Sequence, residues 1–209
     1  MSGSVRHRLV TWDKENGYGV ELVEVDLQAD RLSARGVAIG WDPVPFHLEF
    51  ELTTGARWVT ERLAVSTRGD GWRRTLDLRR SAAGTWSIEA SADGELDLPA
   101  PGGDAAAFTS ALDCDLGNCP LTNTMPVLRH ELLRRDASLD FVMAWVAVPG
   151  LAVHASGQRY TTLGNGGDGL RRIEYRSLDS PFVSELSFDS DGICVDYPQL
   201  GRSVSWPAG

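Results

Sequence analysis

The sequence has no long apolar run and little positive charge. No stretch of about 18 consecutive apolar residues, the length that suggests a membrane-spanning helix, occurs in its 209 residues. Residues 1–8 are basic but no apolar segment follows them, so we expect no secretory signal, no transmembrane segment and a cytoplasmic location. With a net charge of −9, the chain is not expected to present an extended surface for nucleic acid.

Cysteine and histidine are also scarce. Cys114 and Cys119 are close in sequence and Cys194 lies far away, a spacing that fits no zinc signature and predicts buried free thiols. The four histidines show no His-x-His pairing, which disfavours a cupin-like metal site. We therefore predict no metal and no cofactor. The glycine-rich run 164–169 is not followed by a helical pattern, so it predicts a hairpin tip and not a phosphate loop.

The dominant pattern is short alternation of apolar and polar residues. Phe46, Leu48 and Phe50, for example, alternate with His47 and Glu49, as in a half-buried strand. The turns expected between such runs include Asn16-Gly17, Gly69-Asp70-Gly71, Ala83-Gly84 and Asp93-Gly94. The expected strands are centred on residues 23–27, 46–52, 59–65, 72–79, 86–88, 141–148, 151–162, 173–177, 182–188, 193–197 and 203–206. The pattern indicates a mostly β protein with an antiparallel sheet, forming one domain over residues 1–209.

Two segments need separate treatment. Residues 127–135 are ambiguous, because Leu128, Leu132 and Leu133 could line a helix while the start of the segment suits a strand. We prefer the strand. Residues 141–148 are apolar at successive positions, which predicts a strand covered on both faces and the most buried strand of the sheet.

The run 111–130 differs from the rest because it contains many side chains that form specific polar contacts. Asp113 and Asp115 alternate with apolar neighbours, as in a strand with one acidic face. Gly117-Asn118 tolerates positive φ, and Pro120 suits a turn or the first residue of a short helix. The polar residues 122–124 can bond to their own backbone, so we expect this segment to be held in one shape.

The two aspartates are the first candidates for chemistry. On one strand face Asp113 and Asp115 would lie about 7 Å apart, close enough to share a cation or to act as an acid and base pair. They could instead anchor the following segment by accepting backbone N–H bonds. Arg129 is the natural counter-charge, and an aspartate buried beside it would form a structural ion pair.

Aromatic and amide side chains suggest a sugar-binding pocket. Gln158 and Tyr160 face the same side of a predicted strand, and Tyr197 can join them from near the C-terminus. Aromatic bodies with polar tips suit a sugar headgroup, although ordinary sheet packing explains the same pattern. Trp58 and Trp145 lie in predicted strands that could border a cavity.

Several motifs resemble the glycolipid-binding protein family of bacteria. The motifs are Asp113-Cys114-Asp115-Leu116, Pro120-Leu121-Thr122-Asn123-Thr124-Met125-Pro126, Arg129, Trp145-Val146-Ala147-Val148-Pro149, Gln158-Arg159-Tyr160, Phe188-Asp189-Ser190-Asp191-Gly192 and Val195-Asp196-Tyr197-Pro198. The resemblance implies a spiral β-roll, a long antiparallel sheet of about fifteen strands wrapped around one short helix. It also implies that members can form homodimers, and it carries over no catalytic residues.

The favoured function is non-catalytic binding of a glycolipid or another acyl-bearing small molecule in a cavity of the roll. The predicted ligand-binding residues are Asp113, Asp115, Asn118, Asn123, Arg129, Trp145, Gln158, Tyr160 and Tyr197. Two alternatives stay open. One is an enzyme that uses Asp113 and Asp115 on a carbohydrate or ester, and the other is a dimeric structural or regulatory module without a ligand.

Overall fold

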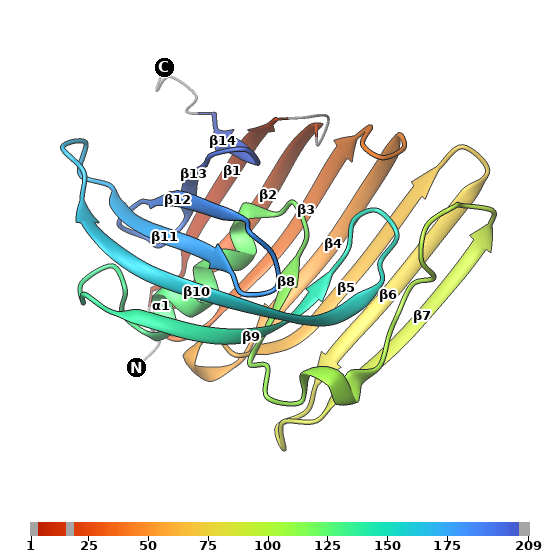
Figure 1. Cartoon of the computed structure of the whole chain (residues 1–209), viewed down its shortest axis with the longest axis horizontal. Helices are drawn as coiled ribbons and strands as arrows, with labels where there is room; N and C mark the ends of the chain where they lie inside the picture. The colour runs from red at the N-terminus through yellow and green to blue at the C-terminus, as the bar shows by residue number, and fades with distance from the viewer. Residues whose placement is uncertain (1–3, 16–18, 205–209) are drawn as a thin grey trace.

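A computed structural model describes residues 4–15 and 19–204, which form one 14-stranded sheet (Figure 1). The strands are β1 Arg6–Lys14, β2 Gly19–Leu27, β3 Leu32–Gly40, β4 Phe46–Thr54, β5 Thr60–Gly69, β6 Trp72–Arg80, β7 Trp86–Gly94, β8 Asp113–Leu116, β9 Ser138–Val146, β10 Val153–Asn165, β11 Arg171–Ser177, β12 Val183–Phe188, β13 Cys194–Tyr197 and β14 Gly201–Ser203. The helical elements are the 3₁₀ turns η1 Ala56–Trp58, η2 Ala105–Phe108 and η3 Pro120–Asn123 and the α-helix α1 Thr124–Arg129.

The sheet is open, and its strands follow one another in a single series from one end to the other. The order is β7-β6-β5-β4-β3-β2-β1-β14-β13-β12-β11-β10-β9-β8, so β7 and β8 are the two ends. Neighbouring strands are antiparallel except β8 and β9, which are parallel. We call β1–β7 the N-terminal half and β8–β14 the C-terminal half. The pairing of β1 with β14 joins the two halves.

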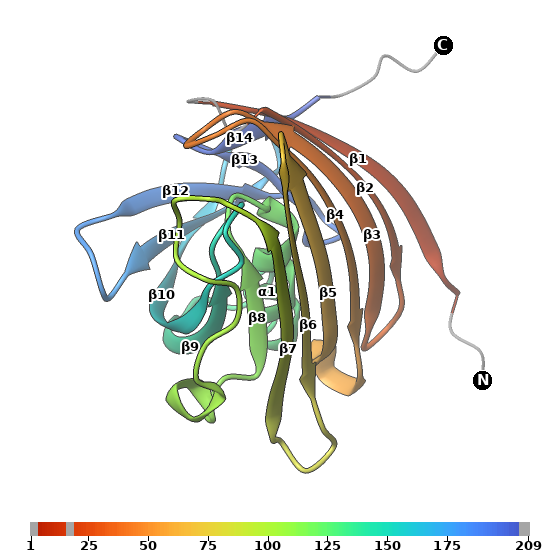
Figure 2. The same ribbon diagram turned by 90° about the vertical axis from the view of Figure 1, so that its right-hand side faces the viewer.

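The sheet curls around α1, as Figure 2 shows from the side. The mostly β fold class and the roll around one short helix are therefore confirmed, with 14 strands among the described residues where about fifteen were expected. In the part of the chain that the structure describes, no helix is long and apolar enough to cross a membrane.

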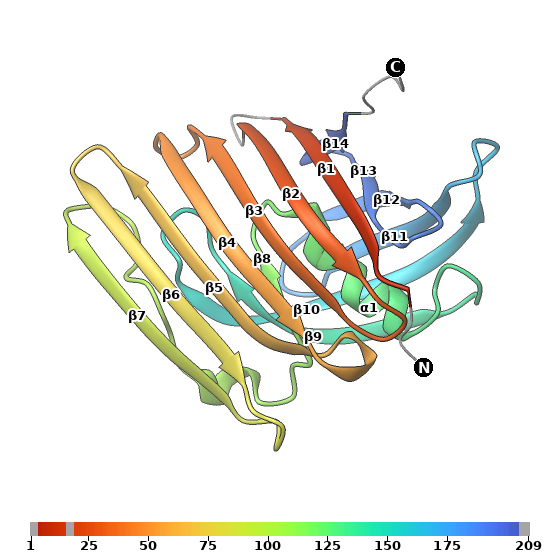
Figure 3. The same ribbon diagram turned by 180° about the vertical axis from the view of Figure 1, so that it is seen from behind.

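Strands of the N-terminal half bury alternate side chains, as the sequence predicted. In β4, Phe46, Leu48 and Phe50 are buried, while Glu49 and Glu51 lie on the exposed face. The same period-two pattern recurs in β2, β3 and β6. Their outer faces form the broad surface seen from behind in Figure 3.

The prediction of a strand over residues 127–135 was wrong. The chain runs from η3 directly into α1, which ends at Arg129, and Glu131 then adopts φ +55. Pro126 lies in the first turn of α1, where its missing N–H removes no helical hydrogen bond. Met125 and Val127 are both fully buried but pack into different core clusters. Because the helix is enclosed by the sheet, its apolar residues show no one-sided pattern.

Three other local expectations need correction. The strand at 141–148 ends at Val146, and only its second part is well covered, because Val142 is 39% exposed. Asp93-Gly94 belongs to β7 and forms no turn there. Trp58 lies in η1 and not in a strand.

Other expectations at the turns and thiols were met or lie outside the described residues. The run 164–169 does connect the hairpin of β10 and β11, and the turn at Ala83-Gly84 is present. The three cysteines are buried and free. Asn16-Gly17 and Trp206 fall outside the described residues.

Two apolar clusters fill the roll on either side of α1 and β8. The larger cluster is centred on the N-terminal half, and side chains from the other half, such as Leu116 and Val146, complete it. We call it the cluster of the N-terminal half, and it is dominated by aliphatic side chains such as Leu52, Leu63 and Leu78, which are fully buried. The cluster of the C-terminal half is richer in aromatic residues and includes Tyr160 and Phe188. Strand β8 separates them, and its alternate side chains point to opposite halves.

Candidate functional site

The site is organised by β8, which lies inside the curl of the sheet beside β9 (Figure 2). Cys114 faces the N-terminal half, where its backbone N–H donates to Thr60 Oγ1 at 3.0 Å. Asp113 and Asp115 pair with Met143 and Trp145 of β9, so both carboxylates face the C-terminal half. The prediction that the two aspartates share a strand face is consistent with this register, but their surroundings differ.

Asp113 forms a buried ion pair with Arg129 of α1. Arg129 Nη1 donates to Asp113 Oδ1 at 2.8 Å, and Nη2 donates to the other carboxylate oxygen. The two side chains are 2% and 1% exposed. Burial raises the pKa of the Asp113 carboxyl, and the hydrogen bonds from Arg129 oppose that rise. The pair ties α1 to β8, and water does not reach it.

Asp115 is held by neutral partners. Thr122 Oγ1 donates to one carboxylate oxygen at 2.8 Å and Gln158 Nε2 donates to the other at 2.6 Å. Burial raises the pKa of Asp115 to about 6, while these two hydrogen bonds oppose the rise and the charge of Asp113 adds to it. A carboxyl with a shifted pKa in a cleft is characteristic of functional sites.

A second set of hydrogen bonds fixes the polar segment against β10. Tyr160 donates its hydroxyl to Asn123 Oδ1 at 2.7 Å and lies 3.3 Å from Gln158 Oε1. Asn123 Nδ2 donates back to the carbonyl of Pro120 at 3.2 Å. The prediction that residues 122–124 bond their own backbone thus holds for Asn123, and also for Thr122, which donates to the carbonyl of Cys119. It was wrong for Thr124, whose buried hydroxyl has no hydrogen-bond partner among the described residues. These bonds preorganise the segment.

A cleft of about 180 Å³ opens directly above this network. It is lined by Asp115, Leu116, Gly117, Asn118, Cys119, Asn123, Trp145, Tyr175, Phe182, Tyr197, Gln199 and Leu200. Its polar floor comes from the segment after β8, and its aromatic walls come from β9, β11 and β13 and the loop before β12. Asn118, at φ +60, makes the sharp turn that was expected of it. We call this space the inner cleft.

The structure sorts the nine predicted site residues into three groups. Asp115, Asn118, Asn123, Trp145 and Tyr197 line the inner cleft. Two others, Gln158 and Tyr160, are buried beneath it and bond to the lining residues. The remaining two, Asp113 and Arg129, form the ion pair and do not line it. Of the two aspartates, therefore, only Asp115 is presented to the cleft.

Sequence reasoning missed two aromatic walls, Tyr175 and Phe182. The ring of Tyr175 lies 5.6 Å from Tyr160 and 6.0 Å from Tyr197, in edge and tilted arrangements. Tyr175 pairs directly with Tyr160 across the β10–β11 hairpin. Tyr160 and Tyr175 are nearly equidistant in sequence from the glycine-rich hairpin tip. Their pairing could therefore have been predicted from the sequence. Phe182 was expected to begin the strand at 182–188, but β12 begins at Val183 and Phe182 lies in the loop before it.

Trp58 does not border the inner cleft. It packs against the aliphatic cluster of the N-terminal half, on the other side of α1. The sequence contains no spacing typical of metal ligands. Within residues 4–15 and 19–204, no group of three His, Cys, Asp or Glu side chains could hold an ion.

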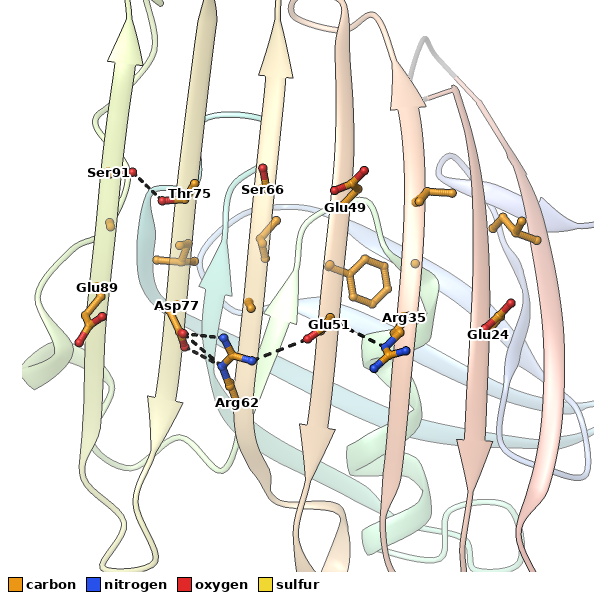
Figure 4. A pocket seen from close by; sticks show the side chains of 18 residues that line it. Glu24, Arg35, Glu49, Glu51, Arg62, Ser66, Thr75, Asp77, Glu89 and Ser91 are labelled. Carbon is orange, nitrogen blue, oxygen red and sulfur yellow. Dashed lines mark hydrogen bonds and ion pairs between the residues drawn. The ribbon is translucent and has the colours of Figure 1, made fainter.

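A larger groove of about 860 Å³ lies on the outer face of the N-terminal half (Figure 4). Four of its seven charged side chains pair with one another. Arg62 bonds both carboxylate oxygens of Asp77, at 2.7 to 3.1 Å, and lies 3.7 Å from Glu51. Arg35 lies 3.3 Å from the same Glu51. The groove is a solvated strand face, and no residue of the predicted set lines it.

The inner cleft is the better candidate site for three reasons. Its floor is preorganised by hydrogen bonds, its carboxyl has a raised pKa, and its walls are aromatic. Ligand sites typically combine apolar walls with a few polar groups placed to fix orientation.

Two comparisons with known proteins agree with this architecture, and no curated protein matches the chain. The crystal structure of a DUF1089 family protein from Pseudomonas aeruginosa superimposes with a TM-score of 0.65 at 24% sequence identity, covering 90% of this chain and 93% of that one. This likeness shows a shared fold. A family model described as "Putative glycolipid-binding" matches residues 9–203. The chain belongs to that family.

Proposed function

We propose that the protein binds a glycolipid without catalysis and holds its sugar headgroup in the inner cleft. The observation that carries the proposal is that Asp115 and Asn118 line one cleft together with the rings of Trp145 and Tyr197. The family description supports a glycolipid as the ligand class.

The chemistry of a sugar ring matches these two surfaces. A ring presents hydroxyl groups around its edge and C–H bonds on its faces. Carboxylate and amide oxygens accept hydrogen bonds from the hydroxyls, while aromatic rings pack against the C–H face. Because Thr122 and Gln158 already fix the Asp115 carboxylate, a ligand does not have to order it.

The size of the inner cleft limits what it can hold. At about 180 Å³, it has roughly the liquid volume of six water molecules, taking about 30 Å³ for each. That suits a single ring better than a ring together with an acyl chain. The cluster of the N-terminal half is filled by fully buried side chains such as Leu63 and Met125. The proposal therefore places the acyl chain outside that cluster.

The enzyme alternative is less well supported by the geometry. A mechanism with two carboxyl groups needs both to reach the substrate, whereas Asp113 is enclosed with Arg129. Binding requires only Asp115.

Calorimetric titration with short glycosides tests the proposal. The ligands are methyl and octyl glycosides of glucose, galactose and mannose, added to the wild-type chain and to the Asp115→Asn and Trp145→Ala variants. We expect at least one sugar to bind. Each variant should weaken it by about tenfold or more, the loss of one charged hydrogen bond or one ring contact.

The matched control is Asp93→Asn, an exposed aspartate on β7 far from the inner cleft. It should bind like the wild type. Absence of binding by every glycoside, or equal affinity of Asp115→Asn and the wild type, would overturn the proposal.

A further inference from the structure

A second chamber of about 370 Å³ adjoins the inner cleft. It is lined by Trp145, His154, Ala155, Ser156, Tyr175, Ser177, Asp179, Ser180 and Phe182. Three aromatic residues, Trp145, Tyr175 and Phe182, line both spaces. We call this space the outer chamber. Because they share these rings, the two spaces are neighbours, and we call the pair the extended site.

The outer chamber has a fixed shape, because the loop between β11 and β12 is bonded to β10. Gly157 donates its N–H to Asp179 Oδ2 at 2.6 Å, and its carbonyl accepts from the N–H of Leu178 at 2.8 Å. A Cβ on Gly157 would lie 3.1 Å from the Leu178 side chain, so the glycine permits this close approach. The loop in turn positions Phe182, whose carbonyl accepts from Ser177 at 3.0 Å.

The lining chemistry of the outer chamber favours a polar occupant with an apolar face. His154 packs against Trp145, with ring centroids 4.8 Å apart. Hydroxyl groups come from Ser156, Ser177 and Ser180, and a carboxylate comes from Asp179. Asp179, Ser177 and Ser180 each accept one hydrogen bond from a backbone N–H. An acyl chain in this place would still remove water from the hydroxyl donors and from the second carboxylate oxygen, which is unfavourable. A second sugar ring would bond to them and pack against the rings.

We propose that the extended site binds a glycan of at least two sugar rings, with one ring in the inner cleft and the next in the outer chamber. This inference rests on the proposed function and adds the length of the headgroup. The shared aromatic rings of Trp145 and Phe182 lie where the two sugars would be linked. The headgroup class is thus a disaccharide or a longer neutral glycan, with its acyl portion beyond the outer chamber.

The test compares matched monosaccharides and disaccharides by calorimetry. The pairs are methyl glucoside with maltose and cellobiose, methyl galactoside with lactose, and methyl mannoside with mannobiose. Ser156→Phe fills the outer chamber, and His154→Ala removes an exposed ring from its wall. Ser87→Phe, at an exposed position of β7, is the matched control.

We expect a disaccharide to bind about tenfold tighter than its monosaccharide, as one additional ring contact with hydrogen bonds provides. Ser156→Phe should remove that gain and leave monosaccharide affinity within about twofold, while His154→Ala should reduce the gain severalfold. Ser87→Phe should change neither. Equal affinity for both ligand lengths, or a Ser156→Phe variant that keeps the gain, would overturn this inference and leave the proposed function standing. Failure of every sugar to bind would overturn both.

Discussion

The two halves of the roll bury similar strands in different ways. The N-terminal half is filled mainly by apolar side chains, and most of its charged residues lie on the outer face, where Arg62 and its acidic partners remain in water (Figure 4). The buried ion pair of Lys14 and Glu21 is an exception. The C-terminal half buries polar side chains on its inner face, including Gln158, which is fully buried. Packing of apolar side chains thus dominates the interior of one half, whereas the other half also depends on buried polar groups that bond to each other.

This difference explains where a ligand can be recognised. Buried polar groups are favourable only when each has a partner, and such networks hold their members in one geometry. In the C-terminal half, Tyr160, Asn123 and Asp115 are held in this way immediately beneath the inner cleft. The N-terminal half also holds buried polar groups with partners, such as Glu21 and Thr67, but these residues line neither the inner cleft nor the groove on the outer face.

The largest expected effect comes from breaking the buried ion pair between β8 and α1. Arg129→Met leaves the Asp113 carboxyl buried without its partner and should lower the free energy of unfolding by about 3–5 kcal/mol. Urea denaturation measures it. The double variant Asp113→Leu with Arg129→Met should recover much of the loss, because no lone charge remains.

Arg159→Ala is the matched control for that prediction. Arg159 bonds to Asp140 at 2.5 and 2.7 Å, but this pair lies in water. Its loss should change stability by less than about 1 kcal/mol. A similar small effect of Arg129→Met would contradict a stabilising role for the buried pair.

A cavity in the aliphatic half should have the next largest effect. Leu63 is fully buried in that cluster, so Leu63→Ala should lower the free energy of unfolding by about 2–5 kcal/mol. Sugar affinity of the folded protein should stay unchanged, since the cavity lies on the other side of β8 and α1. Altered affinity at temperatures where the variant is folded would show that the halves are coupled.

Deleting one oxygen in the C-terminal half should have a smaller effect on stability and a clear effect on binding. Tyr160→Phe removes the donor to Asn123 Oδ1 and should lower the free energy of unfolding by about 1–2 kcal/mol. Glycoside affinity should fall as well, because Asn123 forms part of the floor. Unchanged affinity in calorimetry would indicate that the network is structural only.

The last effect is seen only as a change in the pH dependence of stability. The pKa of Asp115 in the folded protein, about 6, lies above the unfolded value of about 3.9. Its contribution to stability is therefore present below about pH 4 and is lost as the pH rises through about 6. Asp115→Asn should reduce the fall in unfolding free energy across this window, as measured by urea titration at several pH values. Asp93→Asn should keep the wild-type profile, and identical profiles for all three proteins would contradict the raised pKa.

Part of this organisation could be predicted from the sequence. Alternation placed Phe46, Leu48 and Phe50 on the inner face, and it placed Asp113 and Asp115 on a shared face, because the period of a strand is local information. The counter-charge Arg129 followed from its proximity in sequence and the absence of another nearby cation in the polar run.

Other features depend on tertiary contacts that local patterns do not encode. The helix α1 is only six residues long and contains Pro126, so its formation depends on the sheet that encloses it. The different surroundings of Asp113 and Asp115 arise because α1 covers one and the inner cleft opens above the other. Phe182 reaches the cleft through a loop anchored on Gly157, a contact between residues that no strand pattern relates.

The most direct test of the central claim is a nuclear magnetic resonance titration of the indole N–H groups with the tightest glycoside. The chain has seven tryptophans, and Trp145 lines the inner cleft whereas Trp12, Trp72 and Trp86 are buried in the aliphatic cluster. We predict that the Trp145 signal shifts with saturation and that the signals of those three stay in place. A saturable shift confined to Trp41, which is exposed next to β3, or to Trp72, would place the ligand on the N-terminal half and contradict the account.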